Sequence, residues 1–269
     1  MPLIFVSNDD GIESPGIRAT VEAVCVLGEV LVVAPRRQQS TTGRGLGGHK
    51  DERLTPAHFP VGGASVRAFT CEATPAQTVL HGLNVLCAGR RPDLMVSGIN
   101  FGENLGSNIT LSGTVGAAIE AASVGVPALA SSLQTDMSFH HNYGEVDWHA
   151  AVHFTRYFAQ RMLAHGPLPA DVDLMNLVIP ESATPETPWR LTRQSRPPYF
   201  STQLTESGLD ARIGDGRVGV FCDRGAIEPD SDIAAILYDK IVSVTPLSLD
   251  FTSRTDFSML AHRLQGGGM

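Results

Sequence analysis

The chain has 269 residues, of which 42% are hydrophobic and 18% are charged, a balance typical of a folded globular protein rather than a disordered one. Its formal net charge is −8, so it lacks the broad basic field that a nucleic-acid polymer requires. No apolar run reaches the roughly 18 residues of a membrane span, and no basic segment precedes the first apolar run, as it would in a signal peptide. We therefore expect a cytoplasmic protein with no membrane partner and no nucleic-acid polymer as its main partner.

The four cysteines are far apart and form no C-x-x-C pair. Most of them lie in apolar segments, which predicts reduced thiols buried in the core rather than disulfides or a metal site. They are Cys25, Cys71, Cys87 and Cys222.

The first 135 residues alternate short apolar strands with helical segments. Residues 3–6 and 30–34 are continuous aliphatic runs, as in the buried strands of a parallel sheet. Between them, Ser14 and Pro15 predict the start of a helix, and Gly28 predicts its end. Further strands are expected at 66–71, 94–97 and 126–133, with helices from Thr74–Pro75 and over 114–124. This order predicts an α/β fold with a doubly wound, mostly parallel sheet, in which ligands bind beyond the carboxyl ends of the strands.

The order changes toward the C-terminus. A helix at 148–163 and a strand at 174–179 complete the core, which we assign to residues 1–183. Residues 184–269 are assigned to a hairpin, a returning strand and an arm of the same domain. The alternation of Val218, Val220 and Cys222 predicts a hairpin within residues 190–222. Because an isolated hairpin is marginally stable in water, we expect this arm to contact another subunit of a homodimer or larger closed oligomer.

Two adjacent carboxylates, Asp9 and Asp10, follow the first strand and precede Gly11. At the expected ligand edge the two ionised groups repel each other, and one pKa should rise unless a cation neutralises them. A hard divalent cation such as Mg²⁺ or Mn²⁺ prefers oxygen ligands and would resolve the repulsion. The alternative is that both residues only cap the turn and the following helix.

Other polar groups follow later strands. Ser40 lies in a polar loop that could serve a metal or a phosphate, or could simply be flexible. Asn100, just beyond its strand, offers a neutral oxygen to a metal. Ser112, Gly113 and Thr114 begin a helix, where free N–H groups and the positive helix end would meet an anion. The surrounding glycine-rich stretch lacks G-x-x-x-x-G-K-[ST], so it is not a P-loop, and its glycines could serve turn geometry alone.

Several long motifs occur in order along the chain: Ser7-Asn8-Asp9-Asp10-Gly11, Ser97-Gly98-Ile99-Asn100-x-Gly102-x-Asn104-x-Gly106, Ser112-Gly113-Thr114-Val115-Gly116-Ala117-Ala118, and Val242-Ser243-Val244-Thr245-Pro246-Leu247. They resemble the motifs of the SurE family, also called the survival-protein or stationary-phase 5′-nucleotidase family. The likeness covers residues 1 to about 135 well and returns near 174–180 and 230–250.

The resemblance implies a Rossmann-like core and a phosphoric monoester hydrolase that acts on nucleoside 5′- or 3′-monophosphates. It also implies one divalent metal ion per subunit, Mg²⁺ or Mn²⁺, and a homodimer or homotetramer built through C-terminal arms. Carried over by position, the metal ligands fall on Asp9, Asp10, Ser40 and Asn100, with Asp9 and Asp10 also catalytic. The phosphate-binding groups fall on Asn104, Ser112, Gly113 and Thr114.

The chain departs from the family pattern at several positions. Thr41 stands where the family usually has glycine, and Leu111 stands where it has an aromatic residue. Gln77 replaces an aspartate, and Arg254 lies where relatives often place a histidine. These changes can shift substrate preference or weaken activity without changing the class.

Alternative functions remain open. A nucleotide-binding regulatory module could keep the same loops without turnover. A dinucleotide-dependent oxidoreductase would also suit a doubly wound sheet, but the acidic first turn lacks G-x-G-x-x-G and disfavours a pyrophosphate. His149 and His153 are four residues apart on a predicted helix, yet no H-E-x-x-H motif supports a zinc site there.

Overall fold

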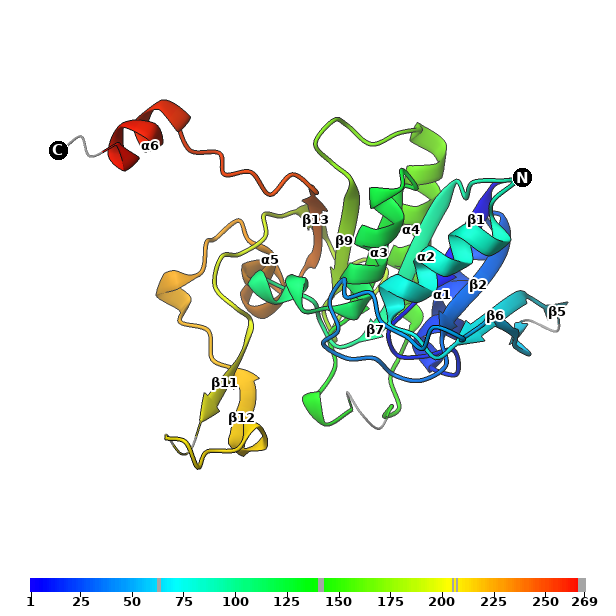
Figure 1. The fold of residues 1–269 in the computed structure, drawn as a ribbon, viewed down its shortest axis with the longest axis horizontal. Coiled ribbons are helices and arrows are strands. Elements are labelled where there is room, and N and C mark those ends of the chain that lie inside the picture. The colour runs from blue at the N-terminus through cyan, green and yellow to red at the C-terminus, as the bar shows by residue number, and fades with distance from the viewer. Residues whose placement is uncertain (62–63, 140–142, 205, 207, 266–269) are drawn as a thin grey trace.

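A nine-stranded sheet forms the centre of the protein (Figure 1). The computed structural model describes residues 1–269 except 62–63, 140–142, 205, 207 and 266–269. The strand order is β10-β13-β9-β8-β7-β1-β2-β6-β3. The strands span β1 Leu3–Ser7, β2 Glu29–Pro35, β3 Thr55–Pro56, β6 Arg67–Cys71, β7 Leu94–Phe101, β8 Ala128–Leu133, β9 Leu174–Ile179, β10 Trp189–Leu191 and β13 Val242–Leu247. Neighbours from β9 through β6 are all parallel, and only β13 on β9 and β3 on β6 are antiparallel, which confirms the mostly parallel sheet.

Helices cover both faces of this sheet (Figure 1). They are α1 Pro15–Val24, α2 Pro75–Leu86, α3 Gly113–Ser123 and α4 His149–His165. Alternate residues of β1 show the division: Ile4 packs in the core cluster of α1 and α4, while Phe5 packs in the cluster of α2 and α3. The doubly wound α/β class predicted from the sequence is therefore confirmed. No helix in the described part of the chain is long and apolar enough to cross a membrane.

The order in which strands are added to the sheet reverses at β1. Strands β2 and β6 extend the sheet on one side of β1, and β7, β8 and β9 extend it on the other. The carboxyl ends of β1 and β7 thus flank a topological switch point, the place where open α/β sheets bind ligands. In the parallel pairing of these strands, Ser7 lies opposite Ser97. Residues that follow β1 and residues at the end of β7 consequently meet at one edge.

Gly98 shapes the end of β7. Its φ is +131°, and an added Cβ would lie 2.2 Å from the Ser131 carbonyl oxygen of β8. The register between β7 and β8 shifts between Ser97 and Asn100 at this point. A side chain at position 98 would push the two strands apart, so glycine is needed for β7 to continue to Phe101 and carry Asn100 to the sheet edge.

Helix α1 begins where the sequence predicted but ends earlier. The Ser14 hydroxyl accepts a hydrogen bond from the Ile17 N–H at 3.4 Å, as an N-cap should. The helix ends at Val24, four residues before Gly28, so the prediction that Gly28 terminates it is wrong. Gly28 instead lies where the chain passes Pro2, because an added Cβ would sit 2.5 Å from the Pro2 carbonyl oxygen.

The C-terminal part both completes the sheet and extends away from it (Figure 1). The returning strand β13 lies between β9 and β10 in the main sheet. Strands β11 Phe200–Leu204 and β12 Gly216–Val220 form the predicted hairpin as a separate antiparallel pair. The remaining elements are β4 Pro60–Val61, β5 Ala64–Ser65, α5 Asp232–Ala234, α6 Phe257–Leu264, a π-helical turn at Ala235–Asp239, and 3-10 turns at Ser107–Thr110, Met137–Phe139, Ile213–Asp215 and Arg224–Ala226. A third core cluster that includes Leu105, Tyr199 and Ile233 packs at the base of the hairpin.

The cysteines only partly follow the prediction. All four are free, and Cys71 and Cys87 are buried. Cys222 is half-buried, and Cys25 is exposed. The expectation of burial is wrong for Cys25 because it follows the last residue of α1, on the solvent side of the turn.

Candidate active site

Asp10 is held at the end of β1 by two donors. The Gln38 amide donates to Oδ1 at 3.1 Å, and the Phe101 backbone N–H donates to Oδ2 at 3.1 Å. The residue is only 4% exposed. Burial, and then repulsion from Asp9, raise the pKa of Asp10 from 3.8 to about 8. In the absence of a cation, this carboxyl group therefore holds its proton at neutral pH.

Asp9 faces the start of helix α3. The Thr114 hydroxyl donates a hydrogen bond to Asp9 Oδ1. Burial raises the pKa of Asp9, while the Thr114 hydroxyl and the backbone N–H groups of Gly113 and Thr114 lower it. Gly113 must lack a side chain here, because an added Cβ would lie 2.7 Å from Asp9 Cβ. The structure thus places Gly113 and Thr114 against Asp9, and neither lines the cavity described below.

A second close approach on α3 positions the loop that carries Ser40. An added Cβ at Gly116 would lie 2.1 Å from the Gly43 carbonyl oxygen. The Gly43 N–H in turn donates to the Leu111 carbonyl oxygen at 2.9 Å. The small-residue face of α3 therefore lets the loop after β2 lie directly on the helix, and this brings Ser40 to the same edge as Asp9.

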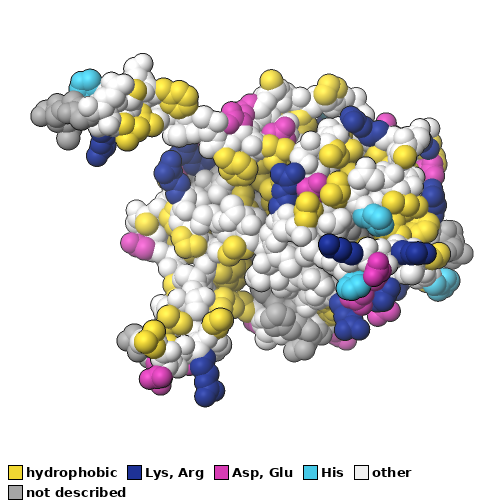
Figure 2. All heavy atoms as spheres, in the orientation of Figure 1, with side chains coloured by type: hydrophobic (Ala, Val, Ile, Leu, Met, Phe, Trp, Pro, Cys, Tyr) yellow, Lys and Arg dark blue, Asp and Glu magenta, His cyan; other side chains and the backbone are white. Residues whose placement is uncertain are grey.

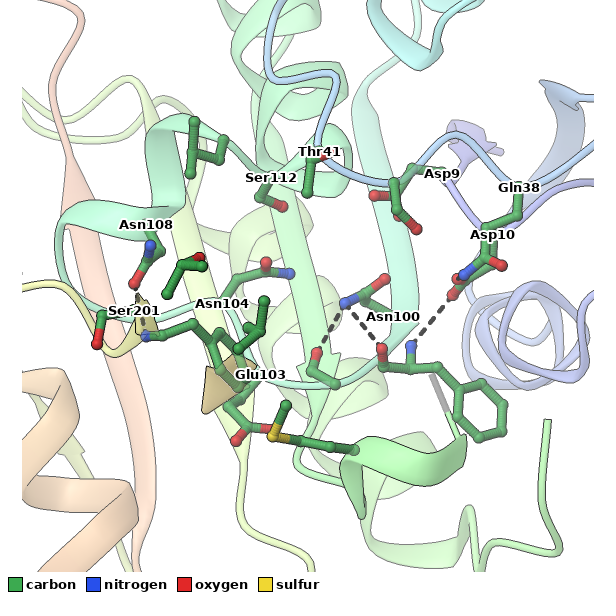
Figure 3. Close-up of a pocket in the computed structure, with 18 residues that line it drawn as sticks. Asp9, Asp10, Gln38, Thr41, Asn100, Glu103, Asn104, Asn108, Ser112 and Ser201 are labelled. Atoms are coloured by element: carbon green, nitrogen blue, oxygen red, sulfur yellow. Dashed lines mark hydrogen bonds between the residues drawn. The ribbon is translucent and has the colours of Figure 1, made fainter. Parts of the chain in front are cut away.

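Asn100 presents its side-chain oxygen to the carboxylates. Its Nδ2 donates to the Gly102 carbonyl at 2.7 Å and to the Phe101 carbonyl at 3.3 Å. Since the amide nitrogen is used in this way, Oδ1 points to the opposite side, toward Asp9 and Asp10 in Figure 3. The oxygen is therefore available to a ligand.

The edge of the sheet carries an all-oxygen donor set. Asp9 and Asp10 supply two carboxylates, Asn100 an amide oxygen and Ser40 a hydroxyl, and all four line one cavity. No ion pair within the described residues includes either aspartate. The described ranges also contain no group of three or more His, Cys, Asp and Glu that could hold a metal, so a cation here would need neutral oxygen ligands as well. The residues present fit a hard divalent cation, whose charge would offset the repulsion between the carboxylates.

Two further predicted residues line the same cavity, which has a volume of about 420 Å³. Ser112 caps α3, and its hydroxyl accepts from the Val115 N–H at 3.1 Å. The Asn104 side-chain amide donates to the Ser132 hydroxyl at 2.8 Å, and the Asn104 backbone carbonyl oxygen accepts from the Asn176 side chain at 2.9 Å. Six of the eight predicted site residues therefore surround one cavity: Asp9, Asp10, Ser40, Asn100, Asn104 and Ser112.

The cavity also has walls that sequence reasoning did not assign to the site. These include Gln38, Glu103, Asn108, Met137, Phe200, Ser201, Thr202 and Val218. The last four come from the hairpin, which the sequence suggested only as an element of assembly. Asn108 lies in the same glycine-rich stretch as Asn104, and this proximity in sequence could have indicated that Asn108 belongs to the site. Nothing in the local sequence pattern connects residues 200–218 to an edge formed by β1 and β7.

Glu103 is a buried carboxyl group on the cavity wall. It is 5% exposed, and its Oε2 has no hydrogen-bond partner among the described residues. Burial raises the pKa of Glu103, and the side chains of Tyr199 and Gln134 partly offset this rise. The group is therefore less acidic than an exposed glutamate.

Three of the residues that depart from the family pattern can be placed in the structure. Thr41 adopts a φ of 61°, the left-handed region that favours glycine, so the loop has a glycine-like backbone despite the threonine. Leu111 is 52% exposed at the cavity wall. Arg254 is far along the C-terminal arm and pairs with Asp171 at 3.6 Å.

Comparisons with known proteins identify relatives of the whole chain. A sequence model of the family described as "Survival protein SurE" matches residues 4–201. The chain is 42% identical over 255 residues to a 5′-nucleotidase SurE of Thermococcus kodakarensis, covering 94% of this chain and 95% of that protein. It is 39% identical over 268 residues to a 5′-nucleotidase SurE of Thermococcus gammatolerans, covering 98% and 96%. The crystal structure of a SurE protein from Aquifex aeolicus superposes with a TM-score of 0.72 at 30% identity, covering 98% of this chain and 100% of that one.

Proposed function

The chain belongs to the SurE family, and from that premise we propose that it is a 5′-nucleotidase, which cleaves nucleoside 5′-monophosphates to nucleoside and phosphate. The observation that carries the proposal is the buried Asp9–Asp10 pair at one end of the cavity. A volume of about 420 Å³ is in the usual range for a small-molecule site and suits a nucleoside monophosphate. Relatives that carry this name support the assignment.

We further propose that Asp9, Asp10, Ser40 and Asn100 hold one Mg²⁺ or Mn²⁺ ion per subunit. The support is the all-oxygen donor set and the absence, among the described residues, of any ion pair to either aspartate. When bound, such an ion polarises phosphoryl oxygens and lowers the pKa of a bound water.

The chain's own residues would position the reaction. Asp9 is the candidate that orients or deprotonates the attacking water, and direct attack by an aspartate carboxylate is the alternative. The Thr114 hydroxyl fixes the orientation of Asp9 through Oδ1. Asn104 and Ser112 line the cavity beside the carboxylates and would bind the phosphoryl oxygens, with the start of α3 adding its positive end.

The wider assignments are proposals of the same kind. They are hydrolysis of 3′-monophosphates, a cytoplasmic location, and a homodimer or homotetramer formed through residues 184–269. Exposed apolar side chains support assembly, and Figure 2 shows them gathered on the hairpin and on α6. They include Leu204, Leu209, Ile213, Phe257, Met259 and Leu264. Helix α6 buries no residue in the single chain, so a second copy would supply the apolar surface that it lacks.

Phosphate release from a panel of nucleoside 5′- and 3′-monophosphates, with Mg²⁺, Mn²⁺ or chelator, tests these proposals. A 5′-nucleotidase releases phosphate from 5′-monophosphates and loses this activity in chelator. The competing function, a regulatory module, would bind the same nucleotides but release no phosphate under any of these conditions.

A further inference from the structure

The cavity has two chemically different ends. The carboxylate end is formed by residues that follow β1, β2 and β7. The opposite end is formed largely by the hairpin, and in Figure 3 Asn108 and Ser201 lie on the far side of Asn104 from Asp10. Leu111 and Met137 also line the cavity, as do Phe200 and Val218 of the hairpin, and all four side chains are apolar. A ligand with its phosphate at the carboxylates would therefore place its other end against the hairpin.

Three of the four hairpin residues that line the cavity share one face of the hairpin. In its antiparallel register, Phe200 lies opposite Val220, and Thr202 lies opposite Val218. Residues two apart on a strand share a face, so Phe200, Thr202 and Val218 lie on the same side of this two-stranded sheet. All three line the cavity.

The first strand of the hairpin is fixed to the loop that carries the phosphate-binding candidates. The Phe200 N–H donates to Asn108 Oδ1 at 2.8 Å. Just before it, Tyr199 is 2% exposed within the cluster that contains Leu105. A β-bridge also joins Gly106 to Pro198. These contacts hold Phe200 at a set position relative to Asn104, as a binding site for two parts of one molecule requires.

The bond to Phe200 also orients the Asn108 amide. Because the Phe200 N–H donates to Oδ1, the oxygen faces Phe200, and the Nδ2 hydrogens on the other branch of the amide remain to donate to a ligand. Asn108 lines the cavity, so these donors suit an acceptor such as a ring nitrogen or a carbonyl oxygen of a base.

We propose that the hairpin forms the nucleobase subsite of this cavity, with Phe200 stacking on the base and Asn108 donating a hydrogen bond to it. This inference rests on the proposed function and adds the residues that recognise the leaving nucleoside. An aromatic ring accepts any base face, so the subsite selects for the presence of a base more than for its identity. The hairpin thereby contributes to substrate recognition within its own chain.

The test compares AMP with ribose 5-phosphate, which has the same phosphate and sugar but no base. We expect wild-type protein to favour AMP in kcat/KM. Phe200→Ala should lower the ratio of the two kcat/KM values by roughly tenfold, the size typical of one base–aromatic stack. Phe200→Tyr keeps the ring and should restore the ratio. Phe221→Ala is the matched control, since Phe221 follows the same hairpin, is 43% exposed and does not line the cavity.

The outcomes separate the subsite from the activity. The subsite is refuted by a wild-type enzyme that does not prefer AMP, or by Phe200→Ala lowering both substrates equally, which indicates a structural role. If wild-type protein releases phosphate from neither compound, the nucleotidase proposal fails. Calorimetric binding of AMP and ribose 5-phosphate to the same three variants then decides the subsite alone: tighter binding of AMP that is lost only in Phe200→Ala supports it, and equal binding overturns it.

Discussion

Replacing Asp10 with asparagine removes one of two buried carboxyl groups that repel each other beside β1. In the unfolded chain the pKa of Asp10 is near its ordinary value of 3.8, whereas in the metal-free fold burial and Asp9 raise it to about 8. The folded state therefore holds one more proton than the unfolded state between about pH 4 and about pH 8, and its free energy of unfolding falls as pH rises through this window. Asp10→Asn should remove the part of that loss that comes from Asp10, while Asp9, whose pKa burial also raises, keeps its own contribution.

The magnitude follows from the pKa shift and the hydrogen bonds. A rise from 3.8 to about 8 corresponds to about 6 kcal/mol of destabilisation above pH 8. Asparagine keeps the volume but offers one acceptor oxygen to the Gln38 and Phe101 donors, which costs about 1–2 kcal/mol. At pH 8 the Asp10 carboxyl group is only half ionised, so its penalty there is about 5 kcal/mol. We therefore expect Asp10→Asn to stabilise the metal-free protein by about 3–4 kcal/mol at pH 8, and to destabilise it by about 1 kcal/mol near pH 4.

Urea unfolding followed by circular dichroism, in chelator at pH 4 and pH 8, measures this difference. Asp51→Asn is the control, because it removes the same charge from a side chain that is 93% exposed. Adding Mg²⁺ at pH 8 should stabilise wild-type protein and have less effect on Asp10→Asn, since binding to the folded state raises stability. A variant that is no more stable than wild type at pH 8, or that differs from it equally at both pH values, contradicts the reasoning.

Four other predictions concern activity, metal, backbone strain and assembly. Asp9→Asn and Asp10→Asn should each lower phosphate release on the order of a thousandfold while circular dichroism stays native, and near-normal turnover at limiting metal argues against the assigned ligands. Dialysis against EDTA should remove activity, and Mg²⁺ or Mn²⁺ should restore it; full activity after verified metal depletion points to a metal-free mechanism. Thr41→Gly should raise the free energy of unfolding by about 1 kcal/mol by relieving a positive φ, measured by urea unfolding, and a loss of stability would show that Thr41 makes compensating contacts. Light scattering at low concentration should show a homodimer or larger closed oligomer, and the double variant Leu209→Glu, Ile213→Glu should reduce its size, since both side chains are fully exposed in the single chain; an active monomer rules this assembly out.

Much of the fold was predictable because its signals are local. Asp9 and Asp10 directly follow the aliphatic run of β1 in the sequence. Because such a run predicts a buried parallel strand, it also places the two aspartates just beyond the carboxyl end of that strand. Helix starts were equally visible, since Ser14 caps α1 as predicted. Strands and helix starts of this kind can be predicted from neighbouring residues alone, without knowing which segments meet in space.

The errors and omissions arise from contacts between distant segments. Gly28 follows a helical pattern as a terminating glycine would, but glycine is needed there because the backbone of Pro2 passes too close for a side chain. Strand β7 continues to Phe101 because Gly98 lets it approach β8, a contact that periodicity cannot reveal. The hairpin residues Phe200 and Val218 reach the cavity through packing at the hairpin base, so no motif could have placed them there.

The place of β13 has a consequence for synthesis of the chain on the ribosome. Strand β9 pairs with β8 on one side, and its other side is covered only by β13, Val242–Leu247. Every strand from β1 to β9 can assemble before residue 242 emerges, and during that interval the apolar β9 is an open sheet edge. Open apolar edges pair readily with other chains. A nascent or truncated chain that stops before Val242 therefore carries a template for aggregation that the last returning strand removes.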